Sequence, residues 1–92
     1  MPVRRPRQSP FVAVDRDLIL DGCLSPISKL LHIVLLALPE DADIDFAATA
    51  ALVGVHTAGE LEKHLEELTD AGLLEKGTQD GEPVLTVHEA AS

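Results

Sequence analysis

Aromatic residues are scarce in this chain of 92 residues, which has no tryptophan, no tyrosine and two phenylalanines, Phe11 and Phe46. Proteins that bind single-stranded nucleic acid stack the bases on exposed aromatic rings, and this chain has almost no candidates for that contact. Hydrophobic residues nevertheless make up 46% of the chain, which excludes a wholly disordered protein. We therefore expect one small domain with a core of Leu, Ile, Val and Ala.

Cysteine and long apolar runs are also scarce. Cys23 is the single cysteine, so no disulfide can form within the chain, and we expect a reducing, cytoplasmic setting. The longest strongly apolar run, residues 27–38, includes Lys29 and His32 and is much shorter than the ~20 residues that span a bilayer. The first ten residues lack the apolar stretch of a signal peptide. No membrane partner is expected.

Patterns that carry enzymatic chemistry are missing as well. The histidines and Cys23 show neither the H-x-x-x-H nor the C-x-x-C spacing of common metal sites. No nucleophile paired with a base and no glycine-rich phosphate loop can be recognised. The sequence therefore predicts a protein that is not an enzyme, with no metal, no cofactor and no small-molecule substrate. The histidines are His32, His56, His64 and His88.

Basic residues are few and unevenly placed. Residues 1–16 hold four arginines and one acid, a charge of +3, while the remainder holds three lysines and 15 acids, a charge of −12. We interpret residues 1–10, which carry Arg4, Arg5 and Arg7 among three prolines, as a flexible basic arm. Such an arm can bind nucleic acid or fold back onto its own acidic domain.

The first long helix is predicted over residues 26–38. Ser25 can cap its N-terminus, and the proline that follows suits the first helical position. Ile33 and Leu36 fall outside the stripe that we expect to be buried. Either residues 11–20 fold over these two side chains, or the two form the face of a homodimer. The expected buried stripe consists of Ile27, Leu30, Leu31, Val34, Leu35 and Leu38.

Two more helices are predicted from their capping residues. Asp45 can cap a short helix over residues 46–53, which Gly54 ends because glycine tolerates the left-handed conformation. Thr57 and Glu60 match the T-x-x-E capping box at the start of a third helix. The buried stripe of that helix would be Leu61, Leu65, Leu68 and Ala71, and Gly72 closes it.

A β-hairpin is predicted after the third helix. Residues 73–76 and 84–87 have the character of strands, and residues 77–82 join them with Asp80-Gly81 as the turn signal. The remaining segments have weaker patterns. We expect extended segments over residues 11–14 and 18–20 and a frayed tail over residues 89–92.

Three short patterns relate these elements to a known family. They are Leu24-Ser25-Pro26 before the apolar helix, Ala50-x-x-x-Gly54-Val55 across the turn, and Leu61-x-x-x-Leu65-x-x-Leu68-x-x-Ala71-Gly72-Leu73-Leu74 at the end of the third helix. In this order they resemble winged helix-turn-helix domains of the small bacterial regulator and replication-initiator type. The resemblance implies a mainly α fold with a small β-hairpin, that is, three helices plus a two-stranded wing, over residues 11–88.

The resemblance also implies a regulator of transcription or replication that binds double-stranded DNA. In such domains the first turn of the third helix enters the major groove, and a flexible arm can reach a minor groove. We therefore expect contacts from the arm, from the third helix and from the wing. The candidate residues are Arg4, Arg5 and Arg7 in the arm, His56, Thr57, Gly59 and Lys63 at the helix, and Lys76, Thr78 and Gln79 in the wing.

The charge of the third helix supports a second hypothesis. Residues 57–70 carry five acids and one lysine, whereas affinity for DNA comes largely from Lys and Arg that neutralise phosphates. An acidic helix can instead bind the basic surface of a partner protein. Both hypotheses stay open from the sequence. The partner-binding residues would be Glu62, Glu66, Glu67 and Asp70.

Overall fold

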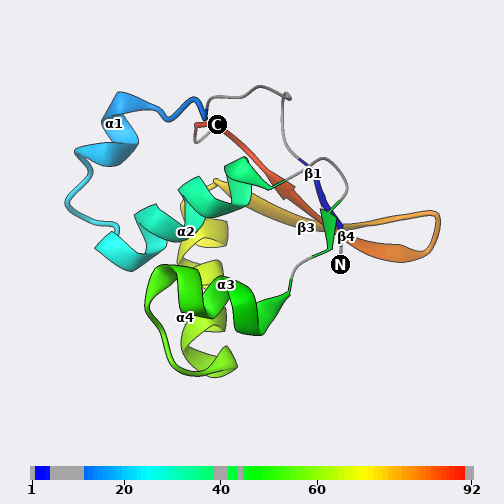
Figure 1. Ribbon diagram of the computed structural model, residues 1–92. Coiled ribbons are helices and arrows are strands. Elements are labelled where there is room, and N and C mark those ends of the chain that lie inside the picture. Colours follow the sequence, from blue (N-terminus) through cyan, green and yellow to red (C-terminus); the bar gives the residue numbers. More distant parts are fainter. Residues whose placement is uncertain (1, 5–11, 39–41, 44, 91–92) are drawn as a thin grey trace.

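The computed structural model describes residues 2–4, 12–38, 42–43 and 45–90. Within these residues it contains four helices and four strands, and the predicted combination of helices with a small antiparallel hairpin is confirmed. Helices α2, α3 and α4 lie together, and the hairpin of β3 and β4 extends away from them (Figure 1). The core is aliphatic and lies between these helices and the base of the hairpin.

Helix α2 (Pro26–Ala37) is the central element and packs against α3, α4 and β4. Its predicted start is confirmed, because the Ser25 side chain accepts a hydrogen bond from the backbone N–H of Ser28. Its buried face is turned relative to our prediction: Leu30 is exposed, whereas His32 and Leu36 are buried. The reason is that the helix is covered on more than one side, since strand β4 (Glu82–Val87) also packs against it.

Helices α3 (Phe46–Val53) and α4 (Ala58–Asp70) are the two that the caps predicted. Asp45 caps α3 by accepting from the N–H of Ala48 at 3.1 Å, and Thr57 caps α4 by accepting from the N–H of Glu60 at 3.1 Å. Gly54 lies between them with φ +82°, in the left-handed region. This turn allows α3 and α4 to pack against each other.

The hairpin is longer than predicted. Strand β3 (Leu74–Gln79) pairs with β4 all the way to Gln79 and Glu82. The six-residue connection that we expected over residues 77–82 is therefore wrong, and Asp80-Gly81 alone makes the turn. Both of these residues have positive φ, which matches the twist of the two strands and lets them pair to their ends.

Two short strands complete a sheet in the order β2-β1-β4-β3. Strand β1 (Pro2–Arg4) lies parallel to β4, and β2 (Ala42–Asp43) lies antiparallel to β1. We predicted a flexible arm over residues 1–10, and within it residues 2–4 form this strand. Residues 5–10 lie outside the described residues. The pairing partners are more than 80 positions apart along the chain, which explains why local patterns did not indicate the strand.

Helix α1 (Arg16–Ile19) replaces the extended segment that we predicted over residues 18–20. Asp15 caps this single turn, because its carboxylate accepts from the N–H of Asp17 at 3.0 Å. The helix buries Leu18 and leaves Ile19 exposed. A short apolar run fits a strand or a turn of helix equally well, and the aspartate cap decides in favour of the helix.

Ile33 and Leu36, the two residues of the expected dimer face, differ in how deeply they are buried. Leu36 is only 5% exposed and belongs to the core of the single chain. Ile33 is half-buried and lines a small cavity together with Val14 and Leu18. Val14 and Leu18, from the segment before α2, thus lie at the same cavity as Ile33. Leu36 is not a surface residue of the monomer.

The left-handed turn at Gly54 can be tested with a matched pair of variants. Gly54→Ala should destabilise the protein by about 1–2 kcal/mol, because an L-residue with a side chain is strained in this conformation. No atom lies within 4 Å of the added Cβ, so the cost comes from φ alone. Gly77→Ala is the control, since this glycine lies in a strand without positive φ and also has free space. Chemical denaturation measures both, and equal effects would contradict the assignment.

Candidate nucleic-acid or partner interface

The residues predicted to lead into DNA lie at the start of α4 and are exposed. They are His56, Thr57, Gly59 and Lys63. The hydroxyl of Thr57 is engaged as the helix cap. The carboxylate of Glu60 lies in the same turn, where its Oε2 accepts from the N–H of His56 at 3.4 Å. The first turn of α4 is thus accessible and presents an acid beside its candidate contacts.

The hairpin residues predicted to contact DNA are exposed on strand β3. Lys76 pairs with Leu85 and Thr78 with Pro83, whereas Gln79 lies next to the turn. Because neighbouring side chains of a strand point to opposite faces, Lys76 and Thr78 share one face and Gln79 belongs to the other. The structure therefore separates these three candidates into two groups.

The arginine candidates are only partly described. Arg4 is the last residue of β1, where it is the register partner of Thr86 on β4. Arg5 and Arg7 lie outside the described residues. Arg4 on β1 therefore belongs to the same sheet as Lys76 and Thr78 on β3, and strand β4 lies between these two strands.

The acidic residues of α4 fall into two groups. Glu62, Glu66 and Asp70 are exposed and recur every four residues, so they lie along one side of the helix. Lys63 lies among them on the exposed face. Glu67 differs, because its side chain is 32% exposed and faces α2. The predicted partner-binding set is thus reduced to three freely presented acids.

Glu67 belongs to a polar cluster that joins α4 to the start of α2. Its Oε1 accepts from the N–H of Ser25 at 2.7 Å, and its Oε2 lies 3.4 Å from the Ser25 hydroxyl. The Nδ1 of His64 lies 3.0 Å from the hydroxyl of Ser28, which is fully buried. The hydrogen bond from the Ser25 backbone holds the pKa of Glu67 below its ordinary value of 4.5. The carboxylate is therefore retained in its charged form at neutral pH.

A cluster of serine, histidine and glutamate invites comparison with a catalytic triad, and its geometry argues against one. In a triad the nucleophile and the orienting acid bond to different nitrogens of the imidazole. Here the hydroxyls of Ser25 and Ser28 lie 3.3 and 3.0 Å from the same atom, Nδ1 of His64, and the Glu67 carboxylate is also nearest to Nδ1, at 4.0 Å. The cluster acts as a joint between helices.

Sequence patterns did not indicate this joint. Glu67 was predicted to lie on the exposed acidic face, and His64 was predicted to be a half-buried spacer beside Leu61 and Leu68; His64 is indeed half-buried. The available signal was the spacing of three between His64 and Glu67, which places both on one side of a helix. What could not be read from the sequence is that the N-terminus of α2 lies opposite them, 39 to 42 positions away.

A second histidine has a structural role. His32 is 2% exposed, and its Nε2 lies 2.6 Å from the backbone oxygen of His88. Because a carbonyl only accepts, Nε2 carries the proton of this hydrogen bond. Burial lowers the pKa of His32 below its ordinary value of 6.5, so the ring remains neutral at physiological pH. His32 thus ties α2 to the end of β4.

Comparisons with known proteins leave the family open. No family model, no curated protein and no solved structure matches the chain. Among the described residues, no group of three or more His, Cys, Asp or Glu side chains is placed to hold a metal ion. The helices in the same part of the chain also lack the length and apolar character needed to cross a membrane.

The contribution of the Glu67 carboxylate to stability can be measured against that of the neighbouring Glu66. Glu67→Ala should destabilise the protein by about 1 kcal/mol at pH 7, because the Ser25 N–H loses its acceptor. Since the folded-state pKa of Glu67 is lowered, this stabilisation is present above pH ~4.5 and is lost as the pH falls through the folded-state pKa. Glu66→Ala is the control for helix propensity and charge. Urea denaturation from pH 3 to 7 measures both, and parallel profiles would argue against the joint.

Proposed function

We propose that the chain is a winged helix-turn-helix domain that acts in DNA-associated regulation, in transcription or replication control, without enzymatic activity. The observation that carries the proposal is the unit of α3, the left-handed turn at Gly54, and α4, followed at once by the hairpin of β3 and β4. This unit leaves the start of α4 exposed while Leu61, Leu65 and Leu68 hold the helix on the core. This order of helices and strands supports the proposed fold, and the proposed function is inferred from the fold.

Charge determines which part of this unit would contact DNA. Lys63 on α4 lies within one helical turn of Glu62, Glu66 and Glu67, so the local potential opposes phosphate. We infer that DNA contacts come from the first turn of α4, from Lys76 on the hairpin and from the arginines near the N-terminus. Binding through so few cations should be weak and strongly dependent on salt.

A titration with random duplex DNA at low salt tests the proposal. Intact protein should bind, and Lys76→Gln should weaken binding and reduce the slope of log affinity against log salt by about one. Replacing Arg4, Arg5 and Arg7 by Gln should weaken it further. Lys29→Gln is the control with the same charge change, because the ammonium of Lys29 is engaged at 2.9 Å with the backbone oxygen of Ile19. Absence of binding by the intact protein would refute the proposal.

Three exposed acids along one side of α4, Glu62, Glu66 and Asp70, support a second candidate function, namely binding of a basic partner protein. Glu62 and Glu66, and likewise Glu66 and Asp70, are like-charged pairs at a spacing of four. Each pair costs the helix ~0.2–0.5 kcal/mol. A face that is unfavourable for helix stability and fully presented to solvent is consistent with selection for a positively charged partner.

A basic probe peptide distinguishes this candidate from a merely solvated surface. We expect a lysine-rich peptide to bind at low salt and to be released when Glu62→Gln, Glu66→Gln and Asp70→Asn are combined. The matched control combines Glu75→Gln, Glu82→Gln and Asp80→Asn on the hairpin, which removes the same charge from exposed positions. Equal loss of binding in both variants would show a general charge effect and would count against a specific α4 surface.

A further inference from the structure

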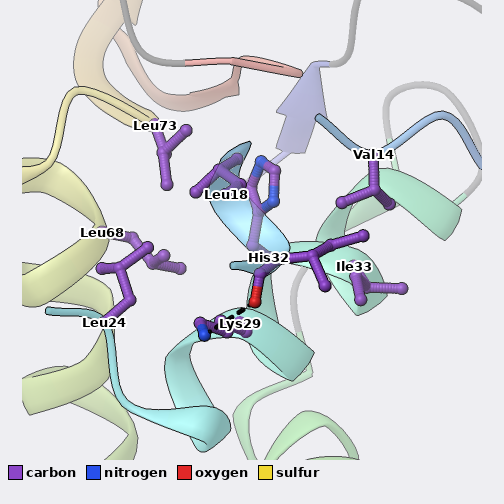
Figure 2. A pocket seen from close by; sticks show the side chains of 9 residues that line it. Val14, Leu18, Leu24, Lys29, His32, Ile33, Leu68 and Leu73 are labelled. Carbon is purple, nitrogen blue, oxygen red and sulfur yellow. Dashed lines mark hydrogen bonds between the residues drawn. The ribbon is translucent and has the colours of Figure 1, made fainter. Parts of the chain in front are cut away.

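A small apolar cavity lies between α1, α2 and the C-terminal end of α4. Its volume is about 80 Å³, which corresponds to roughly three times the ~30 Å³ share of one water molecule in the liquid. The side chains around it come from four separate parts of the chain (Figure 2). The apolar side chains that line it include Val14, Leu18, Leu24, Ile33, Leu68 and Leu73.

The walls of this cavity offer little to a polar molecule. Among the residues that the structure describes, two polar side chains line it, Lys29 and His32. The ammonium of Lys29 bonds to the backbone oxygen of Ile19 at 2.9 Å, and Nε2 of His32 bonds to the backbone oxygen of His88 at 2.6 Å. A buried water needs two to four polar partners, and apolar cavities without them stay dry and accept apolar guests.

The cover of the cavity is the single turn α1. This helix buries Leu18, whereas Ile19 and the following Leu20 are 52% and 74% exposed. Within the described residues, α1 is held by the buried side chain of Leu18, by Ile19 at the cavity wall and by the hydrogen bond from Lys29 to the backbone oxygen of Ile19. A segment with so few buried contacts opens locally at low free-energy cost, and this opening would give a ligand access to the cavity.

We propose that this cavity binds a small uncharged aliphatic group beneath α1. The acidic character of the chain, with net charge −9, disfavours an anionic ligand; Asp17 lies in α1, and Asp15 and Asp21 flank this helix. A guest would contact Leu18 of α1, Leu68 of α4 and Leu73, which leads into β3. It would thereby connect the cover to the junction between α4 and the hairpin. This site goes beyond the proposed function and does not depend on it.

Xenon and butane are suitable probes, observed by methyl NMR of the full chain labelled at Leu, Ile and Val. We expect saturable shift changes for the methyl groups of Leu18, Leu24 and Leu68. Leu52, which is 63% exposed on α3, should show at most a small linear change. Butane should also raise the midpoint of thermal unfolding as its concentration increases, because it binds the folded state. Linear, non-saturating changes at all methyl groups would overturn the proposal.

Variants that fill the cavity make the test specific. Val14→Phe adds volume at one wall and should abolish the saturable shifts while the spectrum remains native. Ile33→Phe adds volume from helix α2 and takes its place if Val14→Phe does not fold. Leu52→Phe is the control for an added ring elsewhere and should leave binding unchanged. Saturable binding of the same strength in a folded, filled variant would show that the probes bind elsewhere.

Discussion

The packing of α2 against α4 is the interaction on which the other features of the structure depend. Leu31 on α2 and Leu61 and Leu68 on α4 have no exposed surface, and burial of each such side chain contributes ~1.5–3 kcal/mol. Leu85 of β4 is 1% exposed and belongs to the same cluster. Because α2 also contacts α3, it sets the position of α3 and α4 relative to the hairpin. Because Leu61 and Leu68 determine which face of α4 is buried, they also determine which face is exposed.

Polar contacts refine this arrangement at the N-terminus and in the middle of α2. At its N-terminus, the Glu67 carboxylate accepts the Ser25 N–H, one of the groups that a helix cannot satisfy by itself. Farther along, His32 bonds to the backbone at His88. Hydrogen bonds are directional, whereas aliphatic packing is not, so these two contacts restrict how α4 and β4 are oriented on the leucine core. Helix α4 thus uses the Glu67 carboxylate to hold α2, whereas Glu62, Glu66 and Asp70 are presented to solvent.

Local sequence patterns predicted the elements whose ends have their own chemistry. The caps at Ser25, Asp45 and Thr57 and the glycine turn at Gly54 were sufficient to place three helices. Patterns were insufficient where stability comes from distant partners. Strand β1 exists through pairing with β4, and the cavity exists because residues from α1, α2 and α4 meet around it. The candidate residues on α4 and the hairpin are exposed, but the inward role of Glu67 was not foreseen.

The sequence by itself determined where α2, α3 and α4 begin, the position of the hairpin turn and the strongly acidic character of the chain. These features depend on interactions between residues a few positions apart and on composition, and both are contained in the sequence itself. The tertiary structure alone decided which acids of α4 are available to a partner, that Leu36 lies inside the monomer, and that α1 covers an apolar cavity. These properties depend on which surfaces meet after folding, and the meeting surfaces come from segments tens of residues apart.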